Sequence, residues 1–286
     1  MRLAERSEKL TARHLVKMKS KGRRIAMITA YDYPTAELVD EAGVDTVLVG
    51  DSAAMVVLGY PDTRFVGIEE MVTFCRAVTR GVRRALVVGD MPFMSYQVSA
   101  EEAVRNAGRL VREGGVDAVK LEGGKEYAEA IRAIARAGIP VMGHVGMTPQ
   151  FFVTSTGYRL RGKSAEDAEA VVKDAEEVAR AGAFSLVLEF AVSEVAEYLS
   201  STLEIPVIGI GAGPKCDGQV LVLHDVIGLY ERSPPFSKRY ADVGSVVLSA
   251  VRSYVEEVKA GSFPGPEHTV SMDPKEWEEF LKRVGR

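Results

Sequence analysis

The sequence has few amide side chains and few cysteines. Asn106 is the single asparagine in 286 residues, and only three glutamines occur. The two cysteines, Cys75 and Cys216, lie far apart and outside any CxxC spacing. This spacing argues against a disulfide framework or a cysteine-rich metal site and predicts reduced, structural thiols. Scarce amides with abundant lysine, arginine and glutamate are typical of proteins from thermophiles.

Long apolar runs and blocks of like charge are also lacking. No stretch approaches the roughly 20 apolar residues that a membrane span needs, and the N-terminus lacks the apolar segment of a secretory signal. The formal net charge is only -4, which gives no support to a nucleic-acid surface. These absences predict a cytoplasmic protein with no membrane partner and no nucleic-acid partner.

The N-terminal residues are basic, but Glu5 and Glu8 interrupt the positive charge. Leu10, Leu15 and Met18 fall roughly at helical spacing, as on an ordinary amphipathic helix. We therefore expect an N-terminal docking helix within residues 1–23 and not a transit peptide.

Short apolar runs alternate with amphipathic segments along most of the chain, as in parallel βα units. Eight such units favour an α/β fold of the closed (β/α)8 TIM barrel type over an open doubly wound sheet. We expect a single domain over residues 1–286, with the barrel over about 24–260 and a C-terminal tail over 261–286. The predicted strands are Arg24–Thr29, Thr46–Val49, Leu86–Val88, Ala118–Leu121, Pro140–Gly143, Ser185–Leu188, Pro206–Ile210 and Val220–Leu223.

Amphipathic segments follow most of these strands and predict the outer helices. Ser99 with Glu102 reads as a capping box, and Ser164 with Asp167 as an acidic variant of it. Extra C-terminal helices are expected after the last strand. The predicted helices are Pro34–Ala42, Ile68–Arg80, Ala100–Glu113, Lys125–Ala137, Ala165–Ala181, Val192–Ser200, Ala241–Lys259 and Pro274–Val284.

Three consecutive apolar runs end in an acid, at Asp51, Asp90 and Glu122. In a barrel, the carboxyl ends of neighbouring strands meet at one mouth, where ligands bind. Three carboxylates in one cleft repel each other, and a hard cation such as Mg²⁺ relieves the repulsion. The alternative is that each acid caps a helix or pairs with an arginine. The pattern favours a metal site.

Other polar residues would reach the same mouth. Lys120 shares a strand face with Glu122, and it either balances charge or holds a substrate carboxylate or oxyanion. Glu189 ends an apolar run in a setting suited to a general base, or else it forms a structural ion pair. His144 either donates a hydrogen bond to substrate or satisfies a loop carbonyl.

The run Ile208–Gly213 has the glycines of a nucleotide-binding loop. It follows a late strand, however, and lacks the acidic residue about 20 positions on that a dinucleotide site needs. The run therefore predicts a tight turn, or a phosphate site of the kind found late in barrels, and not a Rossmann site.

Six motifs in order resemble the ketopantoate hydroxymethyltransferase family, also called 3-methyl-2-oxobutanoate hydroxymethyltransferases. The resemblance runs from about residue 10 to about residue 266, and the tail from Ser271 to Arg286 carries no motif of the family. The motifs are Met27–Asp32, Val49–Ser52, Asp90–Phe93, Lys120–Gly124, Gly143–Gln150 and Ile208–Gly213.

The resemblance implies a (β/α)8 barrel and a transferase of pantothenate and coenzyme A biosynthesis. Its members use Mg²⁺ and move a one-carbon unit from 5,10-methylenetetrahydrofolate to 3-methyl-2-oxobutanoate, which gives 2-dehydropantoate. In an archaeon, a modified pterin could replace the folate carrier. The family also implies a homo-oligomer, often a decamer.

The resemblance assigns roles motif by motif. It implies that Asp51, Asp90 and Glu122 hold the metal and that Glu189 is the proton acceptor. The implied substrate-binding residues are Asp51, Ser52, Asp90, Lys120 and His144.

Two other readings stay open. One is a Mg²⁺-dependent C–C lyase of the phosphoenolpyruvate mutase and isocitrate lyase kind, although neither cysteine follows a suitable strand. The other is a non-catalytic barrel that binds an oxo acid or acts as a scaffold. A scaffold has no need of costly ionisable groups in a desolvated mouth, so the sequence favours the enzyme.

Overall fold

The computed structural model describes residues 8–151, 159–231 and 233–286. The chain divides into two compact units. The first comprises Met1–Val226 and Ser233–Lys238, and the second comprises Ile227–Arg232 and Arg239–Arg286. The assignment of the whole chain to one domain stays a prediction.

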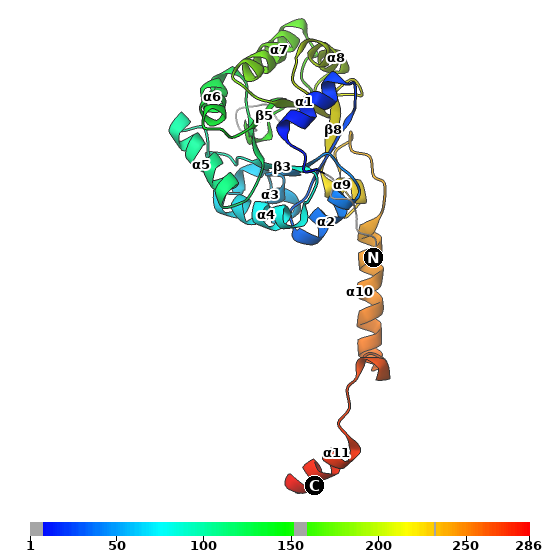
Figure 1. Ribbon diagram of the computed structural model, residues 1–286. Coiled ribbons are helices and arrows are strands. Elements are labelled where there is room, and N and C mark those ends of the chain that lie inside the picture. Colours follow the sequence, from blue (N-terminus) through cyan, green and yellow to red (C-terminus); the bar gives the residue numbers. More distant parts are fainter. Residues whose placement is uncertain (1–7, 152–158, 232) are drawn as a thin grey trace. The chain divides into compact units, whose positions relative to one another are not determined.

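Eight parallel strands form the core of the first unit and close into a barrel in the order in which they occur in the chain. Each strand pairs with the next, and β8 pairs in parallel with β1 to complete the ring. The predicted (β/α)8 barrel is therefore confirmed (Figure 1). The strands are β1 (Ile25–Thr29), β2 (Thr46–Val49), β3 (Leu86–Asp90), β4 (Ala118–Glu122), β5 (Val141–Gly146), β6 (Ser185–Glu189), β7 (Val207–Ile210) and β8 (Gly218–Leu221).

Helices surround this barrel, and α4 to α8 form the outer layer seen in Figure 1. Within the described ranges, no helix combines the length and apolar character needed to cross a membrane. The α-helices are α1 (Ala12–Ser20), α2 (Tyr33–Glu41), α3 (Ala53–Val56), α4 (Ile68–Gly81), α5 (Ala100–Arg112), α6 (Ala128–Arg136), α7 (Ala165–Arg180), α8 (Ser193–Thr202), α9 (Leu223–Ile227), α10 (Val243–Ala260) and α11 (Pro274–Arg283). Short 3₁₀ turns are η1 (Thr63–Phe65), η2 (Lys125–Tyr127), η3 (Pro149–Phe151) and η4 (Pro266–His268).

The side chains that point into the barrel change from apolar to charged along β3 and β4. Successive residues of a strand face opposite sides, so Ala118, Lys120 and Glu122 of β4 share the inner face. Ala118 belongs to the buried apolar cluster inside the barrel, together with Leu86 of β3. The inner face of β3 then ends at Asp90. The apolar core thus fills the amino ends of the strands, and charge gathers at their carboxyl ends.

Helix α1 packs against the amino ends of the strands. Its Leu15 and Met18 are buried in the same apolar cluster as Ile25. Lys19 contacts Asp217 at 2.8 Å and donates hydrogen bonds to backbone carbonyls at the end of α8 and in the turn that follows it. The helix lies within the predicted range 1–23, and residues 1–7 lie outside the described residues.

Several predicted boundaries differ from the structure. The last strand begins at Gly218 and not at Val220, and Gly218 pairs with Ile25 of β1. Gly218 passes so close to Ile25 that a side chain would collide with its carbonyl oxygen. Leu223 instead begins α9, and its N–H is capped by the Thr29 hydroxyl. Ser99 caps α5 by accepting from the N–H of Glu102, but the described hydrogen bonds include no return bond from Glu102.

Candidate functional site

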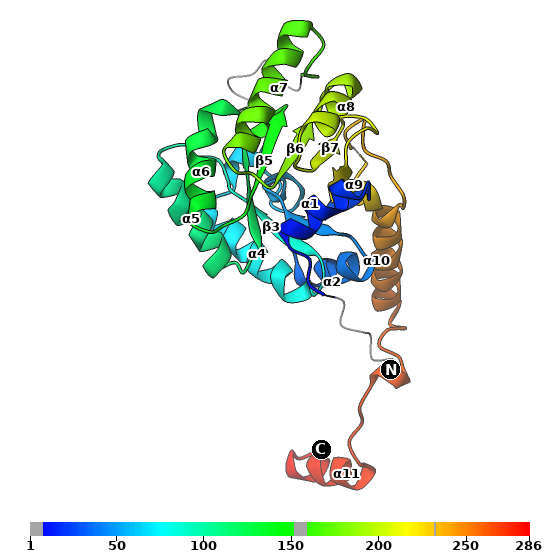
Figure 2. The ribbon, with the colours of Figure 1, turned by 45° about the horizontal axis from the view of Figure 1, so that its top comes forward.

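The predicted site residues lie at the carboxyl ends of neighbouring strands. Asp90, Glu122 and Glu189 are the last residues of β3, β4 and β6, and Asp51 follows β2 after one residue. Figure 2 shows β5, β6 and β7 side by side, and His144 of β5 pairs in register with Glu122 of β4. The barrel therefore brings the predicted acids, Lys120 and His144 to one mouth.

Lys120 forms an ion pair with the acid of the neighbouring strand. Its Nζ lies 2.7 Å from Asp90 Oδ1, and the two side chains are only 4% and 2% exposed. Burial alone would lower the pKa of Lys120, but Asp90 and Glu122 outweigh this effect, and the pKa is raised. Lys120 therefore stays charged at neutral pH.

His144 lies between two carboxylates. Its Nδ1 is 3.4 Å from Glu122 Oε1, and its Nε2 is 3.2 Å from Glu189 Oε2. Burial and Lys120 lower the pKa of His144, but Glu122 and Glu189 outweigh both and raise the pKa to about 9. Among the described residues, the ring thus contacts the carboxylates of Glu122 and Glu189.

The three strand-end acids differ in charge balance. Burial raises the pKa of Asp51 well above its usual range, and the carboxylates of Asp90 and Glu122 raise it further. Burial also raises the pKa of Asp90, although Lys120 opposes this shift. Burial would raise the pKa of Glu122, but His144 and Lys120 outweigh burial, so its pKa is lowered. Negative charge is therefore least compensated at Asp51.

The acids offer the hard oxygen ligands that Mg²⁺ prefers. Asp90 Oδ1 is buried and, among the described residues, makes no directed hydrogen bond beyond its ion-pair contact with Lys120. No group of three or more His, Cys, Asp or Glu side chains stands in metal-holding geometry within the described part of the chain. The donor chemistry of the three acids fits a divalent cation.

Glu189 is more accessible than the acid set, which we define as Asp51, Asp90 and Glu122, because its side chain is 14% exposed against 1% for Glu122. The next residue, Phe190, has a positive φ of 45°, a left-handed conformation that is strained for a bulky side chain. Gly146 of β5 packs so closely on Glu189 that a Cβ would collide with the Glu189 carbonyl oxygen. The backbone around Glu189 is therefore held tightly by its neighbours.

Ser52 lies beside Asp51 and directly precedes the short helix α3, which the sequence did not predict. Its hydroxyl is 2.8 Å from the hydroxyl of Tyr31, a buried residue after β1. Burial raises the pKa of Tyr31, so the phenol stays protonated. Tyr31 is one of the residues near the site that the sequence did not single out.

Gln150 and Tyr96 are two further such residues. Gln150 Nε2 donates to Asp51 Oδ2 at 2.8 Å, and the Tyr96 hydroxyl lies 2.7 Å from Gln150 Oε1. Both residues are almost completely buried. The available signal was the rarity of glutamine and the position of Gln150 at the end of the Gly143–Gln150 motif.

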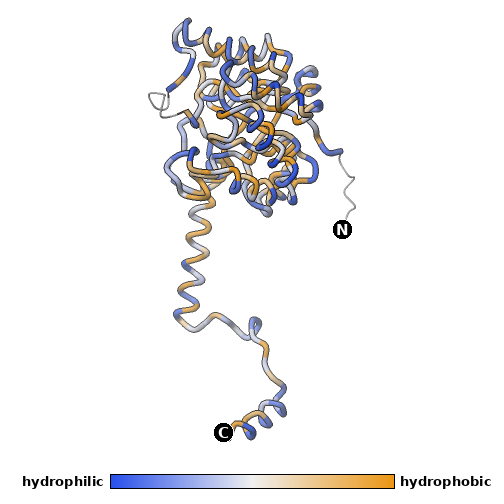
Figure 3. The backbone as a smooth tube through the Cα atoms, turned by 90° about the vertical axis from the view of Figure 1, so that its left-hand side faces the viewer, coloured by the Kyte–Doolittle hydropathy of each residue, from blue (hydrophilic) through white to orange (hydrophobic). Residues whose placement is uncertain are grey.

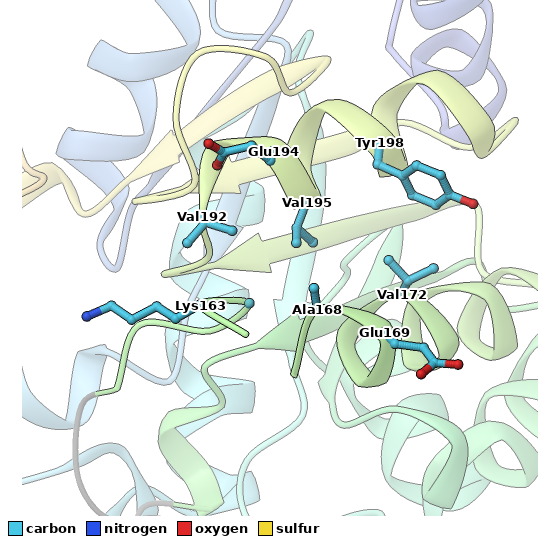
Figure 4. A pocket seen from close by; sticks show the side chains of 9 residues that line it. Lys163, Ala168, Glu169, Val172, Val192, Glu194, Val195 and Tyr198 are labelled. Atoms are coloured by element: carbon cyan, nitrogen blue, oxygen red, sulfur yellow. The ribbon is translucent and has the colours of Figure 1, made fainter. Parts of the chain in front are cut away.

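A hollow lies outside the barrel, between helices α7 and α8, with a volume of about 650 Å³. Figure 4 shows apolar side chains facing this space, and charged side chains lie beside them. None of the predicted site residues lines it. The lining residues are Gly162, Lys163, Ala168, Glu169, Val172, Val192, Glu194, Val195 and Tyr198.

Solved structures similar to the chain support the barrel fold. A phosphonopyruvate hydrolase matches with a TM-score of 0.61 and 13% identity, over 96% of this chain and 95% of the other. A 2,3-dimethylmalate lyase of the PEP mutase/isocitrate lyase superfamily matches with a TM-score of 0.57 and 19% identity, over 96% and 93%. At this identity the likeness extends to the fold alone.

Sequence comparisons are more specific. A protein of Staphylothermus marinus named 3-methyl-2-oxobutanoate hydroxymethyltransferase is 53% identical, over 91% of this chain and 96% of the relative. A protein of the same name from Ignicoccus hospitalis is 55% identical, over 90% of this chain and 98% of the relative. Another, from Pyrococcus abyssi, is 51% identical, over 96% of this chain and 96% of the relative. The sequence model described as ketopantoate hydroxymethyltransferase matches residues 9–266. The chain therefore belongs to the ketopantoate hydroxymethyltransferase family.

Proposed function

We propose that the chain transfers a one-carbon unit to C3 of 3-methyl-2-oxobutanoate and so forms 2-dehydropantoate. The observation that carries the proposal is the arrangement of Glu189 and the acid set at the barrel mouth, with His144 in contact with Glu189 at 3.2 Å and with Glu122 at 3.4 Å. An accessible base beside a cluster of buried acids suits proton removal next to a keto group. The names of the relatives support the same reaction.

We further propose that Asp51, Asp90 and Glu122 hold Mg²⁺, directly or through water. A cation bound there would supply positive charge that stabilises the negative charge developing on a substrate oxygen. Burial and the carboxylates of Asp90 and Glu122 raise the pKa of Asp51, so its ionised form would gain from a nearby cation, which supports this assignment. A phosphonopyruvate hydrolase of similar fold has been crystallised with oxalate and Mg²⁺.

The remaining site residues would bind and orient the oxo acid. Lys120 carries the positive charge that favours a carboxylate or an oxyanion. Ser52 offers a hydroxyl beside Asp51, held by Tyr31. His144 and the Asp51–Asp90 pair complete the proposed substrate-binding set. Holding the substrate in one geometry converts binding energy into rate.

Glu189 would accept the C3 proton of the substrate. The electron pair left at C3 forms the new C–C bond to the methylene carbon of the carrier, and both C–N bonds between that carbon and the carrier break. Water supplies the hydroxyl group of 2-dehydropantoate, and the two carrier nitrogens take up the other water proton and the proton held by Glu189. The ring of His144 contacts the Glu189 carboxylate, so it is placed to orient the base. We propose 5,10-methylenetetrahydrofolate or a modified pterin as the carrier.

Exchange of the C3 hydrogen tests the role of Glu189. In the wild-type protein with Mg²⁺, we expect deuterium from solvent to enter C3 of 3-methyl-2-oxobutanoate, as followed by NMR. Glu189→Gln should stop the exchange while Mg²⁺ affinity, measured by calorimetry, changes little. Glu194→Gln, on the exposed start of α8, is the matched control and should exchange like the wild type.

Two results would contradict the proposal. Wild-type exchange in Glu189→Gln would remove Glu189 from the role of base. A wild-type protein that binds Mg²⁺ and the oxo acid but forms no 2-dehydropantoate with a methylene carrier would reject the transferase function. Release of formaldehyde from added 2-dehydropantoate, the reverse reaction, gives an independent check.

We also propose that the chain forms a homo-oligomer. Apolar side chains recur along helix α10 at Val247, Val251, Tyr254 and Val258, and no other described element of the second unit buries them. Figure 3 shows orange, apolar stretches along this helix. Because an isolated helix depends on packing of its apolar face, a second copy of the chain is the proposed cover.

A further inference from the structure

Gln150 donates hydrogen bonds to two of the site acids, Asp51 and Glu122, and no function has yet been assigned to it. It lies in η3, in the loop after β5, and is 1% exposed. Its side chain and its main chain both donate to site acids. Packing alone does not account for a buried glutamine that donates a hydrogen bond to each of two acids.

The orientation of the Gln150 amide is determined by its neighbours. Its Nε2 donates to Asp51 Oδ2 at 2.8 Å and to the carbonyl oxygen of Met91 at 3.0 Å. A carboxylate and a carbonyl only accept hydrogen bonds, so the NH₂ group must face them. On the other side, Oε1 accepts from the Tyr96 hydroxyl at 2.7 Å.

The main chain of Gln150 reaches a second acid. Its N–H donates to Glu122 Oε2 at 3.0 Å. The Tyr96 hydroxyl accepts from the N–H of Glu122 at 3.2 Å and also lies 2.9 Å from the Glu122 carbonyl. Gln150 and Tyr96 therefore link the end of β4 to the acid that follows β2.

Gln150 differs from the charged neighbours of these acids. Lys120 lies 2.7 Å from Asp90 and compensates its charge. An amide donates without carrying a net charge, so it fixes the position of one carboxylate oxygen and leaves the negative charge available to a cation. Repelling carboxylates would otherwise turn away from one another.

We propose that Gln150 is a positioning residue that holds Asp51 and Glu122 in the arrangement that binds the divalent cation, with Tyr96 holding Gln150. This inference rests on the proposed metal site of the family reaction. It assigns no contact between Gln150 and the substrate.

The test measures binding of Mg²⁺ alone to the full-length protein by calorimetry, without substrate. Gln150→Met keeps the length of the side chain and removes the amide, and loss of such an outer partner typically weakens metal binding about 10- to 100-fold. Tyr96→Phe keeps the buried ring and frees the amide, so we expect a smaller loss in the same direction. Ser185→Ala, which removes the buried bond from Ser185 Oγ to Pro206 at the other end of the barrel, is the matched control and should bind Mg²⁺ like the wild type.

Thermal melting separates positioning from simple stability. If Gln150→Met and Ser185→Ala lower the melting temperature by similar amounts, only the first should raise the Kd for Mg²⁺. An unchanged Kd in both Gln150→Met and Tyr96→Phe would overturn the inference, as would an equal rise in Ser185→Ala. If the wild type binds Mg²⁺ tightly but transfers no one-carbon unit, the proposed function fails while the positioning role stands.

Discussion

The ion pair between Lys120 and Asp90 allows a quantitative test of the site. Lys120→Met removes the ammonium and keeps a side chain of similar length in a completely buried position. Among the described site residues, His144 would then be the remaining positive charge near Asp51, Asp90 and Glu122. Because Lys120 Nζ lies 2.7 Å from Asp90 Oδ1 and both side chains are at most 4% exposed, solvent screens the pair little.

The magnitude follows from the distance and the burial. At an effective dielectric constant of about 20, two unit charges 2.7 Å apart attract by about 6 kcal/mol. Desolvation of both groups offsets part of this attraction. Breaking a buried pair by removing one partner costs about 3–5 kcal/mol, because a charge is left buried and uncompensated. We expect Lys120→Met to lower the free energy of unfolding by that amount in the absence of divalent cations.

Denaturant unfolding with a chelator present is the assay. Lys215→Met is the matched control, because Lys215 pairs with Glu197 at 3.1 Å on the surface, with side chains 55% and 60% exposed, and such pairs contribute less than about 1 kcal/mol. Adding Asp90→Asn to Lys120→Met removes the uncompensated charge. The double variant should therefore lose about 1–3 kcal/mol less than the sum of the two single variants.

Two outcomes would refute this reasoning. One is a loss for Lys120→Met no larger than for Lys215→Met. The other is strict additivity in the double variant, which would mean that Lys120 and Asp90 do not stabilise each other. Mg²⁺ should restore part of the stability of Lys120→Met, because a ligand that binds only the folded state stabilises it.

Other predictions follow from single contacts. Ser99→Ala removes the cap of α5 and should lower the free energy of unfolding by about 1 kcal/mol in denaturant titrations, and an unchanged midpoint would contradict the cap. Gly146→Ala should slow C3 exchange, because the new methyl group would collide with the Glu189 carbonyl oxygen and because Gly146 has a φ of 98°, which favours glycine. A wild-type exchange rate would show that this close packing is unimportant. Val251→Asp in α10 should lower the mass of the assembled protein in sedimentation velocity, while Arg252→Asp should not. Equal assembly masses for the two variants would argue against α10 as the interface.

The barrel and most of the site could be predicted because both depend on local periodicity. Eight alternating units predict the closed sheet, and the two-residue period of a strand places Lys120 and Glu122 on one face. Consecutive strands are neighbours in this fold, so acids at the ends of consecutive runs must meet. No long-range information is needed for either step.

The pairing of the site residues could not be predicted, because it depends on side-chain reach and on loop geometry. Lys120 shares a strand with Glu122, yet its closest contact among the acids is Asp90 on the next strand. Gln150 lies in a loop turn nearly a hundred positions from Asp51 in sequence, and a lone glutamine has no characteristic spacing. Tyr96 holds that glutamine from the loop after β3, a contact between two loops that are far apart in sequence.

The pairing pattern also locates the negative charge that a cation would meet. Lys120 compensates Asp90, and His144 lies against Glu122 and Glu189. Among the described residues, Asp51 has no ion-pair partner and is bound only by neutral donors such as Gln150. Its raised pKa is the result, because burial and the neighbouring carboxylates both disfavour its charge. A divalent cation would gain most from contact with Asp51, so Asp51→Asn should weaken Mg²⁺ binding more than Glu122→Gln, as measured by calorimetry.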